Sequence, residues 1–476
     1  MAGRLIIRDG QVVTPAAVLS ADVLVDRGRI AGVVEPGAVA WPGSRVIDAR
    51  GCLVFPGVVD PHTHIQLDTG IYRTVDDWEI GTRTAAFGGV TTVVDFATQF
   101  PGMTFPEALD ARLRECEPAL IDYGLHMMVT DLPRDPGAAR RWLEELRDLG
   151  VPSIKLYTTY RPNYYADDAT LLHTFRAMPG DMLAMIHCEN DAMVTDATAR
   201  LVAAGKTSWA YHGQGRPPEA EVESIRRVIH LARVAGAAVY IVHNSTAESI
   251  RQVAGAQRAH DGPPVFCETC PQYFWLDDSR YAGPNAEHFI LQPPLRPREW
   301  QVDLLAAWPA LSAVSTDHCD YSLAQKQEHH DFTKTPGGLP GLETLFQLTY
   351  TAGVHQAAAR QAQGELVAPI PLTELARLLS LDPARMFGLF PRKGAILPGS
   401  DADLLIYDPE PEITIRAADQ HTIGGYCPYD GLKVQGQIRT VVSRGDVLVE
   451  DGVLHGERGR GQFLRGKPFD PTGLER

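Results

Sequence analysis

Six side chains of the kinds that bind divalent metals follow short apolar stretches of this chain. They are His62, His64, Lys155, His187, His243 and Asp317. His62 and His64, in "DPHTH", are two residues apart, so on an extended backbone both imidazoles lie on one side and can bind one ion. Any one of the sixteen histidines alone is more typical of a surface or hydrogen-bonded residue. The position of these groups, in or just after five separate apolar runs, indicates a metal site.

Lys155 lies in the middle of the apolar run "PSIKLY". A lysine is almost never fully buried unless its charge is paired or removed. In the simplest interpretation it lies near a strand end and its ammonium reaches solvent. In the other, its amine reacts with carbon dioxide to form a carbamate, whose two oxygens can bridge two divalent cations.

The carbamate interpretation divides the remaining ligands between two metals. One metal would take His62, His64 and Asp317, and the other His187 and His243. A hydroxide between two such metals has its pKa lowered towards about 7, which gives a strong nucleophile at neutral pH.

The elements that must position these groups are eight apolar runs separated by segments with helical spacing, such as 107–116 and 220–236. The runs are 53–60, 90–97, 123–130, 152–157, 181–188, 237–244, 263–270 and 311–318. Buried strands that alternate with helices predict an α/β fold of the (β/α)8 TIM barrel type. In such a barrel the catalytic groups lie at the carboxyl ends of the strands, so these side chains would converge on one cavity.

Both ends of the chain have a different pattern from the middle. The first fifty residues contain short strands with tight Gly and Asp-Gly turns, and similar stretches return at 399–409 and 438–454. We therefore expect a small β-sandwich domain built from 1–55 plus 388–455, a barrel over 56–387, and a C-terminal tail over 456–476.

Composition limits the classes of function. A hydrophobic fraction of 44% and a charged fraction of 22% are ordinary for a globular protein. No apolar stretch approaches the roughly 18–20 residues that span a bilayer, and no secretory signal is visible, which predicts a cytoplasmic protein without a membrane partner. The net charge of −15 disfavours nucleic acid as a partner. The local basic cluster of Arg458, Arg460, Arg465 and Lys467 is more typical of a solvated tail or a subunit contact.

Seven scattered cysteines argue against a disulfide framework. Cys267 and Cys270 form the one CxxC motif, a weak zinc or redox signal without a second pair nearby. Buried structural thiols are the interpretation we favour.

Short sequence stretches along almost the full length of the chain match those of a known protein family. They are "FPGVVDPHTH", "IKLYTTY", "IHCEN", "GRPPEAEVESI", "VYIVHNST", "CETCPQYF", "QPPLR", "STDHCDY", "DFTKTPGGLPGLE", "GSDADLLIYDP" and "YCPYDGLKVQGQIRTVVSRG". In these the chain resembles the dihydropyrimidinase/hydantoinase family of the amidohydrolase superfamily. The metal-ligand motifs are typical of the superfamily, and the "DHC", "DFTK" and "PYDG" stretches of the family.

The resemblance implies hydrolytic ring opening of cyclic ureides, 5,6-dihydropyrimidines or 5-substituted hydantoins, to N-carbamoyl amino acids. It implies two divalent metal ions, usually Zn²⁺, bridged by Lys155 carboxylated by CO2, and a homotetramer acting on a small-molecule substrate. Asp317 would carry the proton from the bridging water to the leaving ring nitrogen. Tyr160, five residues after Lys155, would donate a hydrogen bond to the oxyanion.

Two positions depart from the family pattern. Gln292 stands where many relatives have Ser, and Gly337 where they have Asn. In the family these positions meet the substrate largely through main-chain groups, so both changes are compatible with substrate binding. They leave the preferred ring substituent open, and the loop 161–168 is expected to form part of the wall that selects it.

Other functions remain as alternatives. Dihydroorotase shares the metal chemistry but has an Arg at the position of Gln66, where it holds the substrate carboxylate. Allantoinase generally lacks a tyrosine at the place of Tyr160, and a mononuclear deaminase would not need Lys155. Some relatives are non-catalytic scaffolds that have lost metal ligands, whereas all six ligand positions are intact here.

Overall fold

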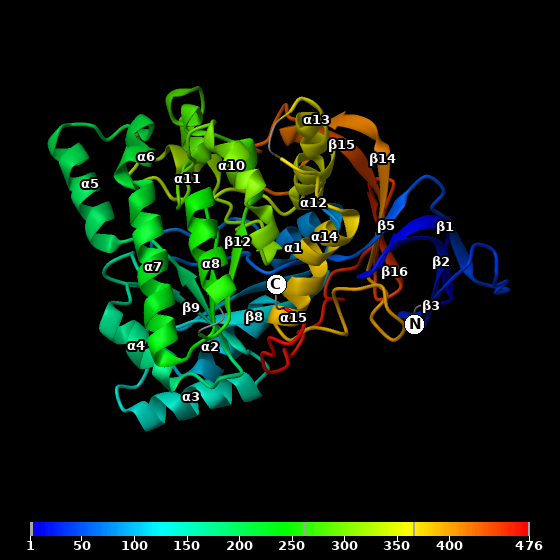
Figure 1. Ribbon diagram of the computed structural model, residues 1–476, viewed down its shortest axis with the longest axis horizontal. Coiled ribbons are helices and arrows are strands. Elements are labelled where there is room, and N and C mark those ends of the chain that lie inside the picture. Colours follow the sequence, from blue (N-terminus) through cyan, green and yellow to red (C-terminus); the bar gives the residue numbers. More distant parts are fainter. Residues whose placement is uncertain (1–2, 260–261, 365–366, 475–476) are drawn as a thin grey trace.

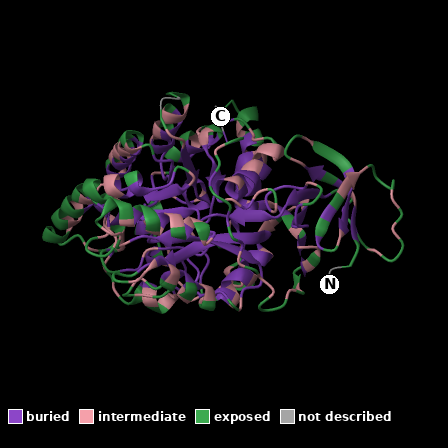
Figure 2. Cartoon of the chain, turned by 90° about the horizontal axis from the view of Figure 1, so that it is seen from below, coloured by how far each residue is buried: buried purple, intermediate pink, exposed green. Residues whose placement is uncertain are grey.

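Eight parallel strands form the centre of the molecule within the residues that the computed structural model describes, 3–259, 262–364 and 367–474. The strands pair in chain order (Figure 1): β6 Val58–Asp60, β7 Val90–Thr98, β8 Asp122–Met128, β9 Ser153–Tyr157, β10 Leu183–His187, β11 Val239–Ile241, β12 Val265–Thr269 and β13 Ala313–Val314. Nearly every residue in them is buried, as Figure 2 shows, because helices cover the outside and side chains fill the inside. The predicted (β/α)8 barrel is confirmed.

The sheet closes between its first and last strands. Thr63 and His318 form a parallel bridge, and His64 N donates to His318 O at 2.7 Å. The Asp60 carboxylate also accepts hydrogen bonds from the backbone N and the hydroxyl of Thr316, at 3.2 and 2.6 Å. Closure therefore brings the segment that carries the first two histidines against the segment that carries Asp317.

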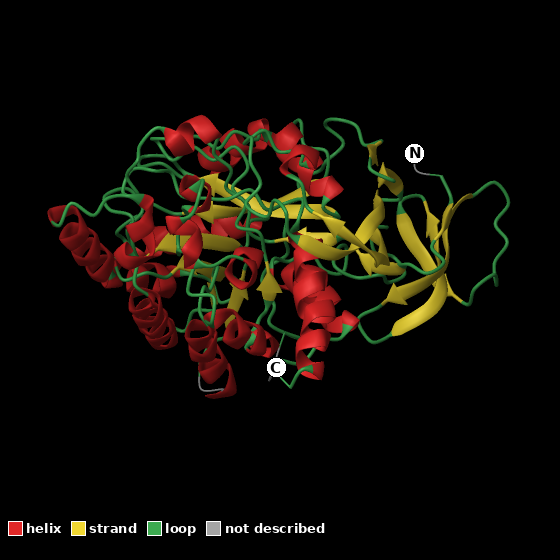
Figure 3. Cartoon of the chain, turned by 90° about the horizontal axis from the view of Figure 1, so that it is seen from above, coloured by secondary structure: helices red, strands yellow, loops and turns green. Residues whose placement is uncertain are grey.

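Helices surround the strands (Figure 3). They are α1 Trp78–Phe87, α2 Phe105–Glu115, α3 Pro136–Asp148, α4 Asp168–Ala177, α5 Asp191–Ala203, α6 His212–Gly215, α7 Pro218–Ala235, α8 Ala247–Ala259, α9 Pro271–Trp275, α10 Trp300–Ala306, α11 Leu323–Gln327, α12 Leu345–Tyr350, α13 Ala357–Ala362, α14 Leu372–Ala376 and α15 Asp382–Met386. Thr104 and Glu107 form a capping box at the start of α2, and α7 ends at Gly236, whose φ of 77° suits a residue without a side chain. No helix of the described ranges is long and apolar enough to cross a membrane.

Strands from both chain ends join in one mixed sheet beside the barrel, nine-stranded in the described residues (Figure 1). They are β1 Leu5–Val13, β2 Val18–Asp26, β3 Arg29–Val34, β4 Arg45–Asp48, β5 Leu53–Pro56, β14 Leu404–Thr414, β15 Lys433–Ser443, β16 Asp446–Glu450 and β17 Val453–Leu454. β5 pairs in parallel with β1 and antiparallel with β14. Val12, Val23, Val54, Leu404 and Val442 pack together in its core.

The run 53–60, which we expected to be a single strand, is divided between the two sheets. Gly57 separates β5 from β6, and its N–H donates to Asp403 O at 2.9 Å. A Cβ at residue 57 would lie 2.2 Å from the hydroxyl of Thr91, so this crossing point has no room for a side chain. The proposed domain boundary at 55/56 falls next to this crossing.

The C-terminal segment after β17 packs against the barrel. Gln462 N donates to an Asp122 carboxylate oxygen at 3.0 Å, Leu464 N donates to Tyr123 O at 2.7 Å, and Leu464 is buried. The basic side chains of this segment are mostly exposed, and Arg458 contacts Glu79 of α1 at 3.3 Å. The segment therefore covers the start of β8, at the amino end of the barrel strands.

Candidate metal centre

One cavity of about 620 Å³ brings together all nine predicted site residues. It is lined by His62, His64, Lys155, Tyr160, His187, His243, Gln292, Asp317 and Gly337, among others. Five of the six candidate ligands lie at or just after the carboxyl ends of β6, β10, β11 and β13, and Lys155 lies in the middle of the short strand β9. The barrel thus gathers at one end groups that lie as far apart in the chain as His62 and Asp317.

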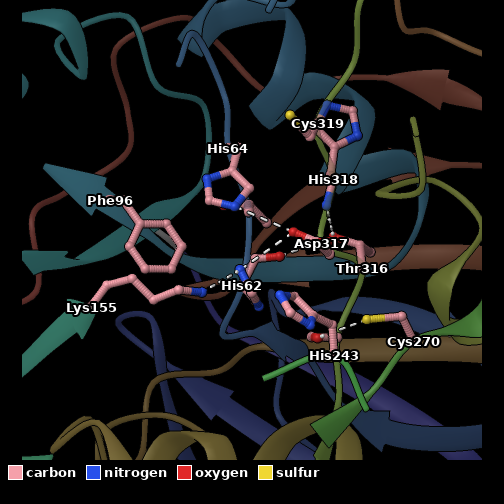
Figure 4. Close-up of polar contacts among 12 residues, drawn as sticks. His62, His64, Phe96, Lys155, His243, Cys270, Thr316, Asp317, His318 and Cys319 are labelled. Atoms are coloured by element: carbon pink, nitrogen blue, oxygen red, sulfur yellow. Dashed lines mark hydrogen bonds and ion pairs between the residues drawn. The ribbon is translucent and has the colours of Figure 1, made fainter. Parts of the chain in front are cut away.

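Three of these side chains lie within metal-binding distance of one another (Figure 4). Asp317 Oδ1 lies 3.4 Å from His62 Nε2 and 3.3 Å from His64 Nε2. Imidazole nitrogens and a carboxylate oxygen are the donors that divalent transition metals prefer, and the three groups could hold one ion. Burial raises the pKa of Asp317, but the two histidines and Lys155 outweigh it and bring the pKa below its ordinary value. Asp317 is therefore a carboxylate at neutral pH.

Lys155 is 1% exposed, which contradicts the interpretation that its ammonium reaches solvent. Its Nζ lies 3.3 Å from His62 Nε2 and 5.2 Å from the centre of the Phe96 ring (Figure 4). Among the described residues it has no carboxylate within ion-pair distance. Burial lowers the pKa of Lys155 to about 8, so a much larger neutral fraction is present near pH 7 than for an ordinary lysine. A buried lysine that has no described carboxylate within ion-pair distance, and whose amine loses its proton more readily than an ordinary lysine, fits a group that is modified before it binds metal.

Two glutamates orient the histidines, and sequence reasoning missed both. Glu268 Oε1 lies 2.5 Å from His62 Nδ1, which leaves His62 Nε2 directed at Lys155 and Asp317. Glu189 Oε2 lies 2.7 Å from His187 Nε2, which leaves the other ring nitrogen for a ligand. Carboxylates in this position fix the tautomer of a metal-binding imidazole. The fully buried position of Glu268 on β12, within "CETC", was the available signal.

The second histidine pair lies beside the first group. The ring centres of His187 and His243 are 4.6 Å apart, and those of His62 and His243 are 5.5 Å apart. The Nδ1 atoms of His64 and His243 are buried without a hydrogen-bond partner in the described part of the chain. The donor set and these orphaned nitrogens fit a centre that holds more than one cation.

The two cysteines of the CxxC motif take no part in this centre. Cys267 and Cys270 are both buried as free thiols, which agrees with the structural interpretation. Burial raises the pKa of the Cys270 thiol well above its ordinary value, so the sulfur stays protonated.

Tyr160 lies beside the second histidine pair, with its ring centre 4.9 Å from that of His187. Its φ of 76° is rare for a residue with a side chain. The Arg216 guanidinium lies 5.3 Å from the ring centre and also binds Glu189, which connects Tyr160 to the support of His187. Burial raises the pKa of the Tyr160 hydroxyl, so it stays a hydrogen-bond donor, and no described residue accepts from it.

Gln66 lies outside the cavity lining, at the position where the dihydroorotase pattern has an arginine. Its Oε1 accepts from the backbone N of Trp78 at 3.3 Å. Apart from Lys155, the lysine and arginine side chains that line the cavity are Arg161 and Lys334, which are largely exposed and contact Asp191 and Asp331. The loop 161–168 contributes Arg161, Asn163 and Tyr164 to the wall, as expected for a segment that contacts a ring substituent.

Comparisons with known proteins agree with this geometry. The model of the Amidohydrolase family matches residues 53–448, so the chain belongs to that family. It is 37% identical to a D-hydantoinase of Streptomyces coelicolor over 97% of this chain and 98% of that protein. It is 38% identical to a D-phenylhydantoinase of Escherichia coli over 99% of this chain and 100% of that protein. The crystal structure of a dihydropyrimidinase from Brevibacillus agri superimposes with a TM-score of 0.91 at 33% identity, over 98% and 99% of the two chains.

Within the family, the likeness over the full length makes the protein a cyclic amide hydrolase of the hydantoinase/dihydropyrimidinase type. Its substrate is a small cyclic amide. The scaffold alternative is thereby excluded.

Proposed function

We propose that the enzyme opens cyclic ureides, 5,6-dihydropyrimidines or 5-substituted hydantoins, to N-carbamoyl amino acids. The observation that carries the proposal is the convergence of a buried, unpaired Lys155 with His62, His64 and Asp317 in a cavity that Tyr160 also lines. The names of the relatives, two hydantoinases and a dihydropyrimidinase, support the same substrate class.

Two divalent metal ions, Zn²⁺ in our proposal, would be held by six side chains of the cavity. Carboxylated Lys155 would bridge them, with His62, His64 and Asp317 on one ion and His187 and His243 on the other. When bound, such a pair of cations supplies an acidified water as the nucleophile.

The chain's own groups would move the proton and stabilise the developing charge. The ionised Asp317 accepts the proton of the attacking water and returns it to the ring nitrogen as the amide bond breaks. The Tyr160 hydroxyl, protonated and without a protein acceptor, donates to the carbonyl oxygen as that oxygen gains negative charge.

Metal analysis combined with a substrate panel tests this function. The purified enzyme is expected to contain close to two divalent ions per chain and to hydrolyse dihydrouracil, dihydrothymine or 5-substituted hydantoins, offered as both enantiomers. Dihydroorotate is expected to be a poor substrate because position 66 supplies no cation to the cavity. If dihydroorotate were the best substrate of the panel, the proposed substrate class would be wrong.

Lys155→Ala is expected to lose the bridge, bind less metal and lose activity. The exposed Lys206 gives a matched control, because Lys206→Ala removes a lysine outside the cavity. Full activity of Lys155→Ala without an added small carboxylate would contradict the carbamate. We also propose a homotetramer, from the family resemblance, which light scattering of the eluting protein would test.

A further inference from the structure

The side chain of Gln292 occupies the space beside Gly337 in the wall of the cavity. A Cβ at residue 337 would lie 1.8 Å from Gln292 Oε1 and 2.4 Å from its Nε2. No side chain fits at 337 while the carboxamide stays in place. The two departures from the family pattern are therefore one structural change, in which a long side chain at 292 takes the room left by a glycine at 337.

The backbone on both sides of this pair is held in place. The fully buried Lys326 donates from Nζ to Ile290 O at 2.8 Å and to Pro336 O at 2.9 Å. Gly338 N also donates to Ile290 O at 3.0 Å. These hydrogen bonds join the two segments close to Gln292 and Gly337, at positions one or two residues away from each. They fix the distance between the backbone of Gln292 and the glycine.

The carboxamide of Gln292 is free to bind a ligand. It is half-buried, it lines the cavity, and no described residue makes a hydrogen bond with it. A carboxamide offers one carbonyl acceptor and two N–H donors side by side. That pattern is complementary to an N–H next to a C=O in another amide.

We propose that Gln292 binds the ureide edge of the substrate ring through paired hydrogen bonds, to the N1–H and the C2 carbonyl, and that Gly337 is required to hold its carboxamide there. This inference rests on the proposed function. The scissile N3–C4 bond must face Asp317 and the histidines, so we place the C2 carbonyl and the N1–H, which lie on the other side of N3 from C4, against this wall. Gln292 then discriminates a cyclic ureide from a cyclic imide, which has a methylene in place of N1–H.

Gln292 would contact neither the attacked C4 carbonyl nor the C4 side of the breaking bond, so we expect its loss to raise KM more than it lowers kcat. Losing a hydrogen bond between neutral groups costs roughly 3- to 10-fold in kcat/KM. A smaller loss is expected on an imide, because it keeps the carbonyl that accepts from the carboxamide N–H but its methylene offers no donor to the carboxamide oxygen.

The first experiment compares dihydrouracil with glutarimide, a six-membered imide. Gln292→Met keeps the length of the side chain and removes its hydrogen bonds. We expect a rise in KM of roughly 3- to 10-fold on dihydrouracil and a clearly smaller one on glutarimide. Gln363→Met is the matched control, because Gln363 is exposed and lies outside the cavity lining. Equal changes on the two rings would overturn the inference.

The second experiment is a double-mutant cycle with Gln292→Ala and Gly337→Ala. The methyl group at 337 displaces the flexible carboxamide, so Gly337→Ala is expected to reproduce the KM of Gln292→Ala at an unchanged melting temperature. The double variant is expected to resemble Gln292→Ala alone, because residues that act through one contact are not additive. Additive effects, or none from Gly337→Ala, would overturn the coupling.

The two proposals fail in different ways. A metal-loaded wild type that hydrolyses no ureide overturns the proposed function and this inference together. A wild type that opens dihydrouracil, with a Gln292→Met variant that matches it on both rings, overturns this inference alone.

Discussion

At the scale of single residues, the site holds three side chains on backbone that such residues rarely adopt. Tyr160, His243 and Asp317 have φ values of 76°, 37° and 50°. Each lies at or beyond the carboxyl end of a barrel strand, where the chain must turn sharply while its side chain stays directed at the cavity. Strained backbone of this kind persists when the surrounding structure enforces it, and it concentrates at functional sites.

Tyr160→Phe isolates the hydroxyl proposed to stabilise the oxyanion. Removing one such donor typically lowers turnover by about 10²–10³-fold, and the effect falls on kcat more than on KM because the bond is strongest in the transition state. The ring remains, so its packing against His187 and Arg216 and the metal content are expected to persist. Steady-state kinetics and metal analysis of one sample check this. Near-normal turnover would remove Tyr160 from the mechanism.

Lys155 predicts a pH dependence for carbamate formation in the metal-free enzyme. Carbon dioxide reacts with the neutral amine, and burial lowers the pKa of Lys155 to about 8. At constant dissolved CO2 the rate of modification is expected to rise with pH and to level off above about 8, because the amine is then already deprotonated. The carbamate signal in ¹³C NMR, with labelled bicarbonate, follows the reaction. A rate that keeps rising towards the ordinary lysine pKa would show that the amine is not desolvated.

At the scale of elements, the strand pattern and the ligand positions could be predicted because five of the eight apolar runs carry a candidate ligand, four at or after their end and one, Lys155, within the run. Glu268 and Glu189 could not, since their roles depend on contacts between neighbouring strands and loops. Glu268 accepts from Tyr240 Oη at 2.7 Å and from His243 N at 3.1 Å, on the adjacent strand and the segment after it. The division of 53–60 was missed for a similar reason, because Gly57 is required by its contact with Thr91 and not by local sequence.

Glu268→Gln tests the support that β12 gives to the metal centre. The variant keeps the shape of the side chain and removes the charge that holds His62 Nδ1, so metal affinity is expected to fall by roughly 10- to 100-fold. Zn²⁺ titration against a competing chelator measures it. Glu287→Gln is the control, because Glu287 is also buried but lies outside the cavity lining. Equal affinities for the two variants would contradict the role of Glu268.

At the scale of the whole molecule, one buried lysine joins the barrel to the mixed sheet. Lys393 Nζ lies 2.7 Å from carboxylate oxygens of Asp122, at the start of β8, and of Asp403, just before β14. Burial lowers the pKa of Lys393, but the carboxylates of Asp403, Asp122 and Asp401 outweigh it and raise the pKa, so the ammonium stays charged. Asp122 also accepts from Gln462 N, which adds the C-terminal segment to the same junction.

Lys393→Met is expected to lower the free energy of unfolding by about 3–5 kcal/mol, because it removes the one buried ammonium that Asp122, Asp401 and Asp403 share. The junction is at the opposite end of β8 from the cavity, so kcat of the folded enzyme is expected to change little. Lys433→Met removes an exposed ion pair with Glu412, which is worth about 0–1 kcal/mol. Thermal and denaturant unfolding compare the two. If Lys393→Met lost no more stability than Lys433→Met, the junction would contribute little to the free energy of unfolding.

The pairing of β5 between β1 and β14 has a consequence for the synthesis of the chain. β5 leaves the ribosome early, but its partner β14 follows about 350 residues later. At the usual speed of translation this interval lasts roughly 20 to 70 seconds. During it one edge of a strand with the sequence Leu-Val-Phe-Pro is open to pairing with another nascent chain. The order of translation therefore sets how long this strand edge waits for its partner.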